Sequence, residues 1–453
     1  MKVHFIAIGG SAMHNLAIAL VKKGDQVSGS DDEIFEPSKG RLKKYGILPE
    51  TEGWFPAKIT TDLDAVIVGM HARIDNPELK IAQELGLKIY SYPEYLYEQS
   101  KNKKRVVIGG SHGKTTITSM ILHVLNFFHI PNDYMVGAQL EGFEVMVKMT
   151  EDAPVMIFEG DEYLTSPIDR RPKFHLYKPD IALISGIAWD HINVFPTFEN
   201  YVDQFRIFAD LVTENGTLIF CSEDDEVLKI GETTRKDIEA IPYAIPDHYI
   251  KDGTTFIVNN DNKIPLKVFG EHNLMNIEGA RLVCHQLEIS DKMFYDAIRT
   301  FTGASKRLEL VAQNEFTTLY KDFAHSPSKL VATTNAVKAQ FENRELVACI
   351  ELHTFSSLSL EFLSHYKGSL DSADIPIVYF NPHTIQLKKL PPITIEQVKE
   401  AFDNQKIEVY TDSDKLREDL LNTDWKNKNL LMMSSGNFDG IDFEKLGKEM
   451  TNQ

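Results

Sequence analysis

The sequence contains the run Val106-Val107-Ile108-Gly109-Gly110-Ser111-His112-Gly113-Lys114-Thr115-Thr116. Its apolar start predicts a buried strand, its glycines predict a tight turn, and residues 115–128 predict the helix that follows. Glycines let backbone N–H groups approach phosphate oxygens, and the N-terminus of a helix favours negative charge. Lys114 would neutralise the outer phosphates of a nucleotide, and the Thr115 hydroxyl would reach Mg²⁺. The run therefore predicts a phosphate-binding loop.

The spacing of this turn differs from the most common phosphate-binding pattern. The pattern GxxxxGK[ST] would need glycine at the position of Ile108, whereas the residues from Gly110 to Thr115 fit the shorter form GxxGK[ST]. A tight turn with a surface lysine is the alternative interpretation. The strand before the turn and the helix after it favour nucleotide binding.

Acidic residues follow the next predicted strands of this region. The strand 155–158 runs into Glu159-Gly160-Asp161-Glu162, and the strand 181–184 leads to Asp190-His191. The carboxyl ends of parallel strands form the usual ligand-binding edge of an open sheet. Because Mg²⁺ prefers oxygen ligands, Thr115 and Glu159 are candidate metal ligands, and His191 is a less usual one. Taken alone, the acidic run predicts an exposed turn; beside a phosphate loop, it predicts a metal site.

Strands and helices alternate along the chain, which predicts an α/β protein with parallel, doubly wound sheets. The polar stretch 101–104 and a new pattern near Gly303 divide the chain into three predicted domains, residues 1–103, 104–303 and 304–453. We expect the N-terminal and C-terminal domains to be Rossmann-like and the central one to carry a parallel sheet like that of P-loop ATPases. Residues 243–267 predict a small antiparallel hairpin region appended to the central domain.

The first predicted strand also ends in a glycine turn, Gly9-Gly10-Ser11. The dinucleotide pattern GxGxxG is broken, because Ala7 and Ala12 stand at two of its glycine positions, and a hydride-transferring dehydrogenase is therefore disfavoured. Two interpretations of this turn remain open: it faces another anionic ligand, or it is purely structural. Asp31, at the end of the second strand, suits either a ribose hydroxyl or a backbone amide.

The composition bounds the class of protein. The chain has 453 residues and a formal net charge of −18, which speaks against a nucleic-acid binder. Its three cysteines, Cys221, Cys284 and Cys349, are far apart, so we expect small buried residues and a reducing compartment. We find no signal peptide and no apolar run of membrane-spanning length, and we expect a cytoplasmic protein without a membrane partner.

Several motifs together resemble the Mur ligases, which are ATP-dependent amide ligases of peptidoglycan synthesis. These motifs come in the family's order: Gly110–Thr116, Glu159–Glu162, Asp190-His191, Gly270–Asn276, Lys306–Glu309 and Tyr320–Pro327. The resemblance covers essentially the whole chain. Residues 161–174 and Tyr177 look like the murein peptide ligase branch, which attaches the tripeptide L-alanyl-gamma-D-glutamyl-meso-diaminopimelate to UDP-N-acetylmuramate in cell-wall recycling. The neighbouring branch adds only L-alanine.

The resemblance implies a role for each matching residue. The first domain would bind the UDP-sugar, the central one ATP, and the third would close on ATP and bind the amine. The carboxylate would be activated as an acyl phosphate. The implied sites are ATP at Gly110, Ser111, His112, Gly113, Lys114, Thr115, Thr116, Asn273, Asn276 and Asp322; Mg²⁺ at Thr115, Glu159 and His191; UDP-sugar at Gly10, Ser11, Asp31, His71 and Asn76; catalysis at Lys114, His191, Arg307 and His325; and the amine at His353.

The sequence departs from the family pattern at three places. Ala188 stands where an acidic residue often precedes the Asp-His pair, Ser326 replaces a second histidine, and His353 stands where relatives carry arginine. The last change leaves the amine open between the tripeptide and L-alanine. Two other classes stay open: a P-loop kinase or ATPase, and a nucleotide-sugar-binding regulator without catalysis. The residues Lys114, Thr115, Glu159 and His191 argue against the regulator, because binding UDP alone would need none of them.

Overall fold

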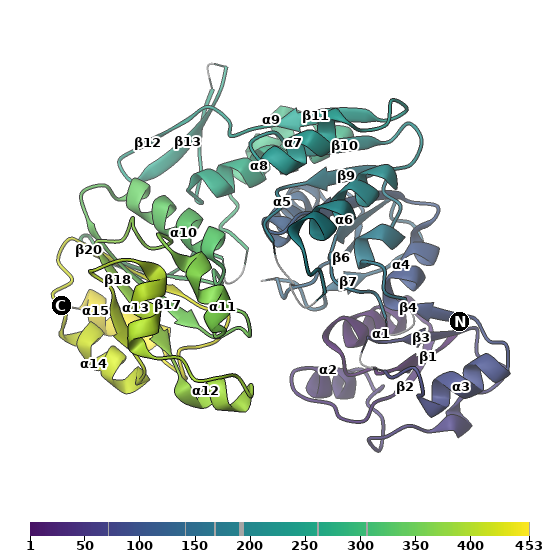
Figure 1. The fold of residues 1–453 in the computed structure, drawn as a ribbon. Helices are drawn as coiled ribbons and strands as arrows, with labels where there is room; N and C mark the ends of the chain where they lie inside the picture. The colour runs from purple at the N-terminus through teal and green to yellow at the C-terminus, as the bar shows by residue number, and fades with distance from the viewer. Residues whose placement is uncertain are drawn as a thin grey trace. The chain divides into compact units, whose positions relative to one another are not determined.

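The structure is a computed structural model and describes residues 1–70, 72–140, 142–166, 169–189, 194–260, 262–304 and 307–452. Contacts divide the chain into two compact units (Figure 1). Unit 1 comprises Met1–Ala244 and Asn276–Ile298, and unit 2 comprises Ile245–Met275 and Arg299–Gln453. The α/β class with parallel sheets is confirmed, whereas the three domain ranges stay a prediction.

The first sheet of unit 1 is parallel throughout and has the strand order β2-β1-β3-β4. The inner strand β1 is buried after its first residue, which explains why Val3, Phe5 and Ile6 are apolar, whereas His4 is a buried polar residue. The strands are β1 (Lys2–Ile6), β2 (Gln26–Ser30), β3 (Ala65–Val68) and β4 (Ile89–Ser91), and the helices are α1 (Ser11–Lys23), α2 (Ser38–Lys44), α3 (Pro77–Glu84) and α4 (Tyr92–Ser100).

The second sheet of unit 1 has the order β11-β10-β9-β5-β8-β6-β7, and within it only β7 runs antiparallel to its neighbour. The strands are β5 (Lys104–Gly109), β6 (Asp133–Met135), β7 (Val147–Lys148), β8 (Val155–Glu159), β9 (Ile181–Ile184), β10 (Thr217–Cys221) and β11 (Glu239–Tyr243). Its helices are α5 (Lys114–Phe127), α6 (Phe198–Asp210) and α7 (Asp225–Glu232), and α9 (Asp291–Ile298) also belongs to unit 1. Because β5 lies between β8 and β9, the ends of all three strands meet at one edge.

The connection between two strands of this second sheet contacts the first two helices of the chain. Residues 136–146 connect β6 to β7, and the Asn15 side chain of α1 accepts a hydrogen bond from the Met146 backbone N–H at 2.9 Å. On the surface, Glu144 forms ion pairs with Lys22 at 2.6 Å and Lys44 at 2.5 Å. A buried hydrogen bond, exposed ion pairs and the hydrogen bond from Arg41 to Gln139 thus attach the connection to α1 and α2.

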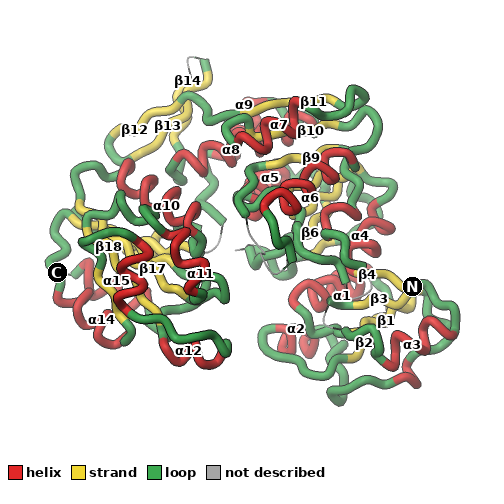
Figure 2. Tube along the Cα trace, in the orientation of Figure 1, coloured by secondary structure: helices red, strands yellow, loops and turns green. Residues whose placement is uncertain are grey.

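Unit 2 is built around a six-stranded sheet of order β15-β16-β20-β17-β18-β19, in which β15 is antiparallel to β16 and the other pairs are parallel. Figure 2 colours the helices red and the strands yellow. Its strands are β15 (Glu309–Gln313), β16 (Thr318–Asp322), β17 (Glu345–Leu352), β18 (Ile375–Phe380), β19 (Glu408–Tyr410) and β20 (Lys428–Met433). Its helices are α10 (Pro327–Gln340), α11 (Leu360–Leu363), α12 (Pro382–Leu387), α13 (Ile395–Phe402), α14 (Ser413–Asn422) and α15 (Phe443–Thr451). Helix α8 (Glu271–Gln286) begins in unit 2 and ends in unit 1.

The predicted hairpin region is an antiparallel sheet of β12 (His248–Lys251), β13 (Thr254–Asn259) and β14 (Asn262–Pro265). We expected it as an appendage of the central domain, but its contacts place it in unit 2. The physical reason is the buried side chain of Gln340 on α10, which accepts from the Thr255 hydroxyl at 2.9 Å and donates to the Gly253 carbonyl at 2.6 Å. Local alternation predicts such strands but not the partner on which they pack.

Cys221, Cys284 and Cys349 are all buried as thiols, as expected. Burial raises the pKa of each thiol. Among the helices of the described residues, none combines the length and the hydrophobicity of a membrane span.

Candidate active site

The predicted phosphate loop leaves β5 after Gly109 and enters α5 at Lys114, as the sequence indicated. Gly110 and Gly113 both have left-handed φ angles, +134° and +79°. A Cβ atom at Gly113 would lie 2.5 Å from Asn276 Oδ1, and one at Gly110 would collide with the Ser185 hydroxyl. Both positions therefore need glycine, for conformation and for space.

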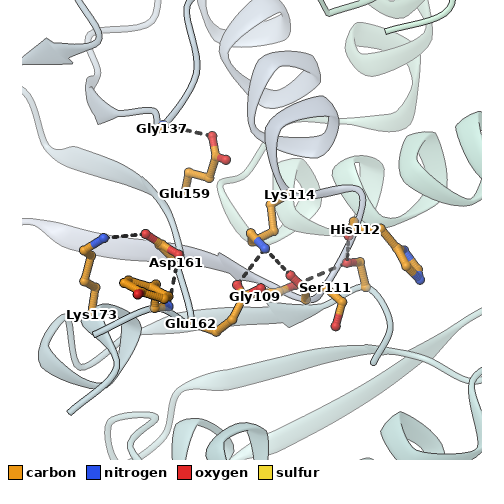
Figure 3. A network of polar contacts seen from close by, with 12 residues as sticks. Gly109, Ser111, His112, Lys114, Gly137, Glu159, Asp161, Glu162 and Lys173 are labelled. Atoms are coloured by element: carbon orange, nitrogen blue, oxygen red, sulfur yellow. Dashed lines mark hydrogen bonds and ion pairs between the residues drawn. The ribbon is translucent and has the colours of Figure 1, made fainter. Parts of the chain in front are cut away.

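Lys114 lies at this turn and is paired with a buried acid (Figure 3). Its Nζ donates to Glu162 Oε2 at 2.7 Å and to the Gly110 carbonyl. The Glu162 side chain is 2% exposed, and the Tyr201 hydroxyl donates to its other oxygen at 3.1 Å. Burial alone would lower the pKa of Lys114, but the nearby carboxylates of Glu162, Asp161 and Glu159 together outweigh it and the pKa is raised. The loop therefore holds a charged ammonium group that an incoming phosphate would draw away from Glu162.

Thr115 and Glu159 form a second pair beside the loop. The Thr115 hydroxyl donates to Glu159 Oε1 at 2.7 Å, and the Gly137 backbone N–H donates to Oε2 at 3.0 Å. Burial raises the pKa of the Glu159 carboxyl. Glu159 is thus a desolvated carboxylate whose direct partners are neutral donors. The structure brings together the two candidate Mg²⁺ ligands that it describes.

The rest of the turn rests on the segment that follows β9. The Ser111 N–H donates to the Gly186 carbonyl at 2.8 Å, and the Ala188 N–H donates to the Ser111 hydroxyl at 2.9 Å. The His112 ring lies against Gly186, where a Cβ atom would come within 2.5 Å of its Cε1. Thr116 is buried in the first turn of α5. Two predicted site residues, His191 and His71, lie outside the described residues, as does Asp190.

In the first sheet, Asp31 holds the glycine turn. Its Oδ2 accepts from the Gly9 N–H at 2.6 Å, which is the backbone-amide alternative of the sequence analysis. Burial raises the pKa of Asp31 to about 6. Gly10 is the N-cap of α1 and Ser11 its first residue. The Asn76 side chain caps α3 by accepting from two backbone N–H groups, so helix capping accounts for this residue, and its predicted role in sugar-nucleotide binding stays a prediction.

The residues predicted on α8 and in unit 2 have clear local roles. Asn276 faces Gly113 of the phosphate loop, and the Asn273 amide donates to the Phe269 carbonyl at 2.8 Å. Asp322 accepts from the N–H groups of Leu308 and Ala324 at 3.1 and 2.9 Å and from a threonine hydroxyl at 3.2 Å. Burial raises its pKa. These bonds fix the loops at the end of β16.

Arg307 and His325 meet around one aromatic ring in unit 2. The Arg307 guanidinium lies 4.9 Å from the centre of the Phe323 ring, and the His325 ring packs edge-on to it at 5.2 Å. His325 Nδ1 also hydrogen-bonds the Phe323 carbonyl at 2.8 Å. The structure therefore brings together the two residues predicted to approach the reaction centre.

Sequence reasoning missed three polar side chains. Tyr201 and Ser185 support the phosphate loop, and Glu351 lies 3.5 Å from the predicted amine residue His353. Glu351 had a usable signal, because like Glu159 it is an acid near the end of an apolar strand. Tyr201 had none, since an aromatic residue on an amphipathic helix normally predicts core packing.

Two family models match the chain. Residues 2–104 match the Mur ligase family, catalytic domain, and residues 108–284 match the Mur ligase middle domain. Curated relatives include the UDP-N-acetylmuramate–L-alanine ligase of Clostridium kluyveri, 30% identical over 82% of this chain and 82% of that protein. The same enzyme of Carboxydothermus hydrogenoformans is 27% identical over 99% of this chain and 97% of its own. The chain therefore belongs to the Mur ligase family and is an ATP-dependent, ADP-forming carboxylate–amine ligase of peptidoglycan metabolism.

Solved structures agree on the fold. A murein peptide ligase of Psychrobacter arcticus matches with a TM-score of 0.61 and 21% identity, covering 100% of this chain and 99% of that one. A UDP-N-acetylmuramate–alanine ligase of Thermotoga maritima matches with a TM-score of 0.69 and 20% identity, covering 100% and 98%. A MurF ligase of Thermotoga maritima, solved in complex with ADP, matches with a TM-score of 0.61 and 16% identity over 86% and 88%.

Proposed function

We propose that this ligase joins the carboxylate of UDP-N-acetylmuramate to the N-terminal amine of L-alanyl-gamma-D-glutamyl-meso-diaminopimelate, a reaction of cell-wall recycling. The carboxylate oxygen attacks the γ-phosphorus of ATP, the bond to the β-phosphate oxygen breaks, and ADP leaves. The amine then attacks the acyl carbon, phosphate leaves with the bonding electrons, and the amine loses a proton. The observation that carries the ligase chemistry is the charged Lys114 at a glycine turn beside the Thr115–Glu159 pair.

Lys114 has the central role in the first step. As the phosphates enter, its ammonium group would leave Glu162 and neutralise the charge that develops on the transferred phosphoryl group. The backbone N–H groups from Gly110 to Thr115 would hold the phosphate oxygens at the start of α5. Of the residues in unit 2, Arg307 and His325 would act at the reaction centre, and Asn273 and Asp322 would contact the adenosine. Asn276, which belongs to unit 1, would contact the adenosine as well.

The residues fit a Mg²⁺ ion. Glu159 is a buried carboxylate with a raised pKa whose direct partners, Thr115 and Gly137, are neutral, and a carboxylate and a hydroxyl oxygen are donors that Mg²⁺ accepts. When bound, the ion would neutralise phosphate charge. Thr115 and Glu159 would hold it, with His191 as the third predicted ligand. Glu159→Gln should raise the Mg²⁺ concentration needed for half-maximal phosphate release; an unchanged requirement would contradict the assignment.

Two acceptors compete for the second step. Residues 161–174 support the tripeptide, because their sequence looks like the recycling branch; the ion pair of Asp161 with Lys173, at 2.6 Å, ties the two ends of this segment together. The curated relatives support L-alanine, since those at 27–30% identity carry that name. We favour the tripeptide and keep L-alanine as the second candidate.

The experiment that tests the proposal is phosphate release from ATP, Mg²⁺ and UDP-N-acetylmuramate, with either the tripeptide or L-alanine added. We expect phosphate and a new UDP-muramyl product only with the tripeptide. Product with L-alanine alone would assign the chain to biosynthesis. Phosphate release that does not depend on any amine would contradict the ligase reaction.

A further inference from the structure

A buried carboxylate lies at the carboxyl end of β17. Glu351 is 4% exposed, and its Oε2 accepts from the Phe438 N–H at 2.8 Å and from the Ser434 hydroxyl. Both donors belong to residues 434–440, the loop that follows β20. Because β17 and β20 are parallel neighbours, Glu351 and this loop meet at the ligand-binding edge of the sheet.

The loop itself is tightly built against this acid. A Cβ atom at Gly436 would lie 2.7 Å from Glu351 Oε2 and 2.8 Å from His353 Nδ1, so the position needs glycine. Further along the loop, Phe438, Asp439 and Gly440 have left-handed φ angles of 51°, 57° and 93°, which cost free energy for the two non-glycine residues. Such conformations persist where the surrounding structure enforces them.

Among the described residues, no lysine or arginine forms an ion pair with Glu351, and its basic neighbour is a histidine. Its Oε1 lies 3.5 Å from His353 Nδ1, a distance that exceeds that of an ordinary hydrogen bond. Nearby, the Ser435 hydroxyl is buried without a hydrogen-bond partner among the described residues. A desolvated carboxylate without a cation is costly, and a ligand that carries positive charge would remove that cost.

We propose that Glu351 binds a primary ammonium group of the amine acceptor, with His353 and Ser435 beside it. The inference rests on the proposed ligase function and assigns the acceptor's recognition to an acid rather than to the histidine. The tripeptide offers two such groups, its N-terminal ammonium and the side-chain ammonium of diaminopimelate, and L-alanine offers one. The simpler possibility is that Glu351 only anchors the loop.

Glu351→Gln tests the inference, because glutamine keeps the size and an acceptor oxygen but loses the charge. We expect the KM for the acceptor to rise about 10-fold to 100-fold, with the KM for ATP unchanged. Glu345→Gln is the matched control at the other, exposed end of β17, and it should leave both KM values unchanged. Ser434→Ala removes a hydrogen bond to Glu351 but keeps its charge. An acceptor KM that Ser434→Ala raises as much as Glu351→Gln, or that Glu351→Gln leaves unchanged, would overturn the inference.

A tripeptide whose third residue lacks a side-chain ammonium shows which of the acceptor's two ammonium groups Glu351 binds. If its KM is insensitive to Glu351→Gln while the parent peptide's KM rises, Glu351 binds the side-chain ammonium. If both KM values rise alike, it binds the N-terminal one. Failure of the proposed function is distinguishable, because the wild-type chain would then use only L-alanine, and the same comparison would be made with that acceptor.

Discussion

At the scale of single residues, Lys114 is expected to contribute both to catalysis and to the stability of the fold. Lys114→Ala should lower ATP-dependent ligation by about 100-fold to 1000-fold, because the phosphoryl charge loses its neutralising group. It also leaves Glu162 buried without its cation, so we expect the free energy of unfolding to fall by about 3 kcal/mol. Phosphate release and urea unfolding measure the two effects. Near-normal ligation by this variant would contradict the assignment of residues 110–115 as a phosphate-binding loop.

A second residue, Asp31, predicts a pH dependence. Its pKa is about 6 in the folded chain and 3.8 in the reference state, so the folded chain holds its proton more tightly. This contribution to stability is complete below about pH 4 and is lost as the pH rises through 6. We therefore expect Asp31→Asn to gain stability relative to the wild type between pH 4 and pH 7. Parallel urea-midpoint curves for the two proteins would contradict this.

The residues that sequence could identify are those with a local pattern. Lys114, Thr115 and Glu159 follow strands at fixed offsets, and the structure brings them together. The pairing of Lys114 with Glu162 could not be foreseen, because it depends on where a second strand lies. Asp31 illustrates the remaining ambiguity: the sequence left ribose and backbone open, and the Gly9 amide is the partner that the structure describes.

At the scale of elements, the connection 136–146 allows the stabilising effect of a buried hydrogen bond to be compared with that of exposed ion pairs. Asn15→Ala should reduce the free energy of unfolding by about 1–3 kcal/mol, because the Met146 N–H is left buried without its acceptor. Glu144→Ala removes two surface ion pairs and should leave the urea midpoint unchanged, since exposed pairs are weakened by solvent. Equal losses in the two variants would contradict this ranking.

Whole strands were the most predictable elements. The central residues of β5, β8 and β9 are short apolar runs that are buried on both faces, and the composition of such runs predicts a strand. The antiparallel strands β12 to β14 could also be predicted from the sequence. Their packing against Gln340 could not, because it is a long-range contact that no local sequence pattern encodes.

At the scale of the molecule, the two compact units predict two responses to heat. The residues proposed for the UDP-sugar that the structure describes, Gly10, Ser11, Asp31 and Asn76, all belong to unit 1. A ligand that binds only the folded state adds about 2.7 kcal/mol at a hundred times its Kd. We expect UDP-N-acetylmuramate to raise the calorimetric transition of unit 1 and to leave that of unit 2 in place. A shift confined to unit 2 would contradict the assignment.

Because its three thiols are buried, the natural chain should react little with thiol-directed labels. Cys221, Cys284 and Cys349 lie out of solvent, and burial keeps their thiols protonated at neutral pH. A maleimide dye should therefore react slowly with the unmodified protein. Two cysteines introduced at exposed positions, one in each unit, would carry a donor and an acceptor fluorophore without removal of any of the three natural cysteines. Energy transfer between them would then report, one molecule at a time, whether the distance between the two labels changes during turnover.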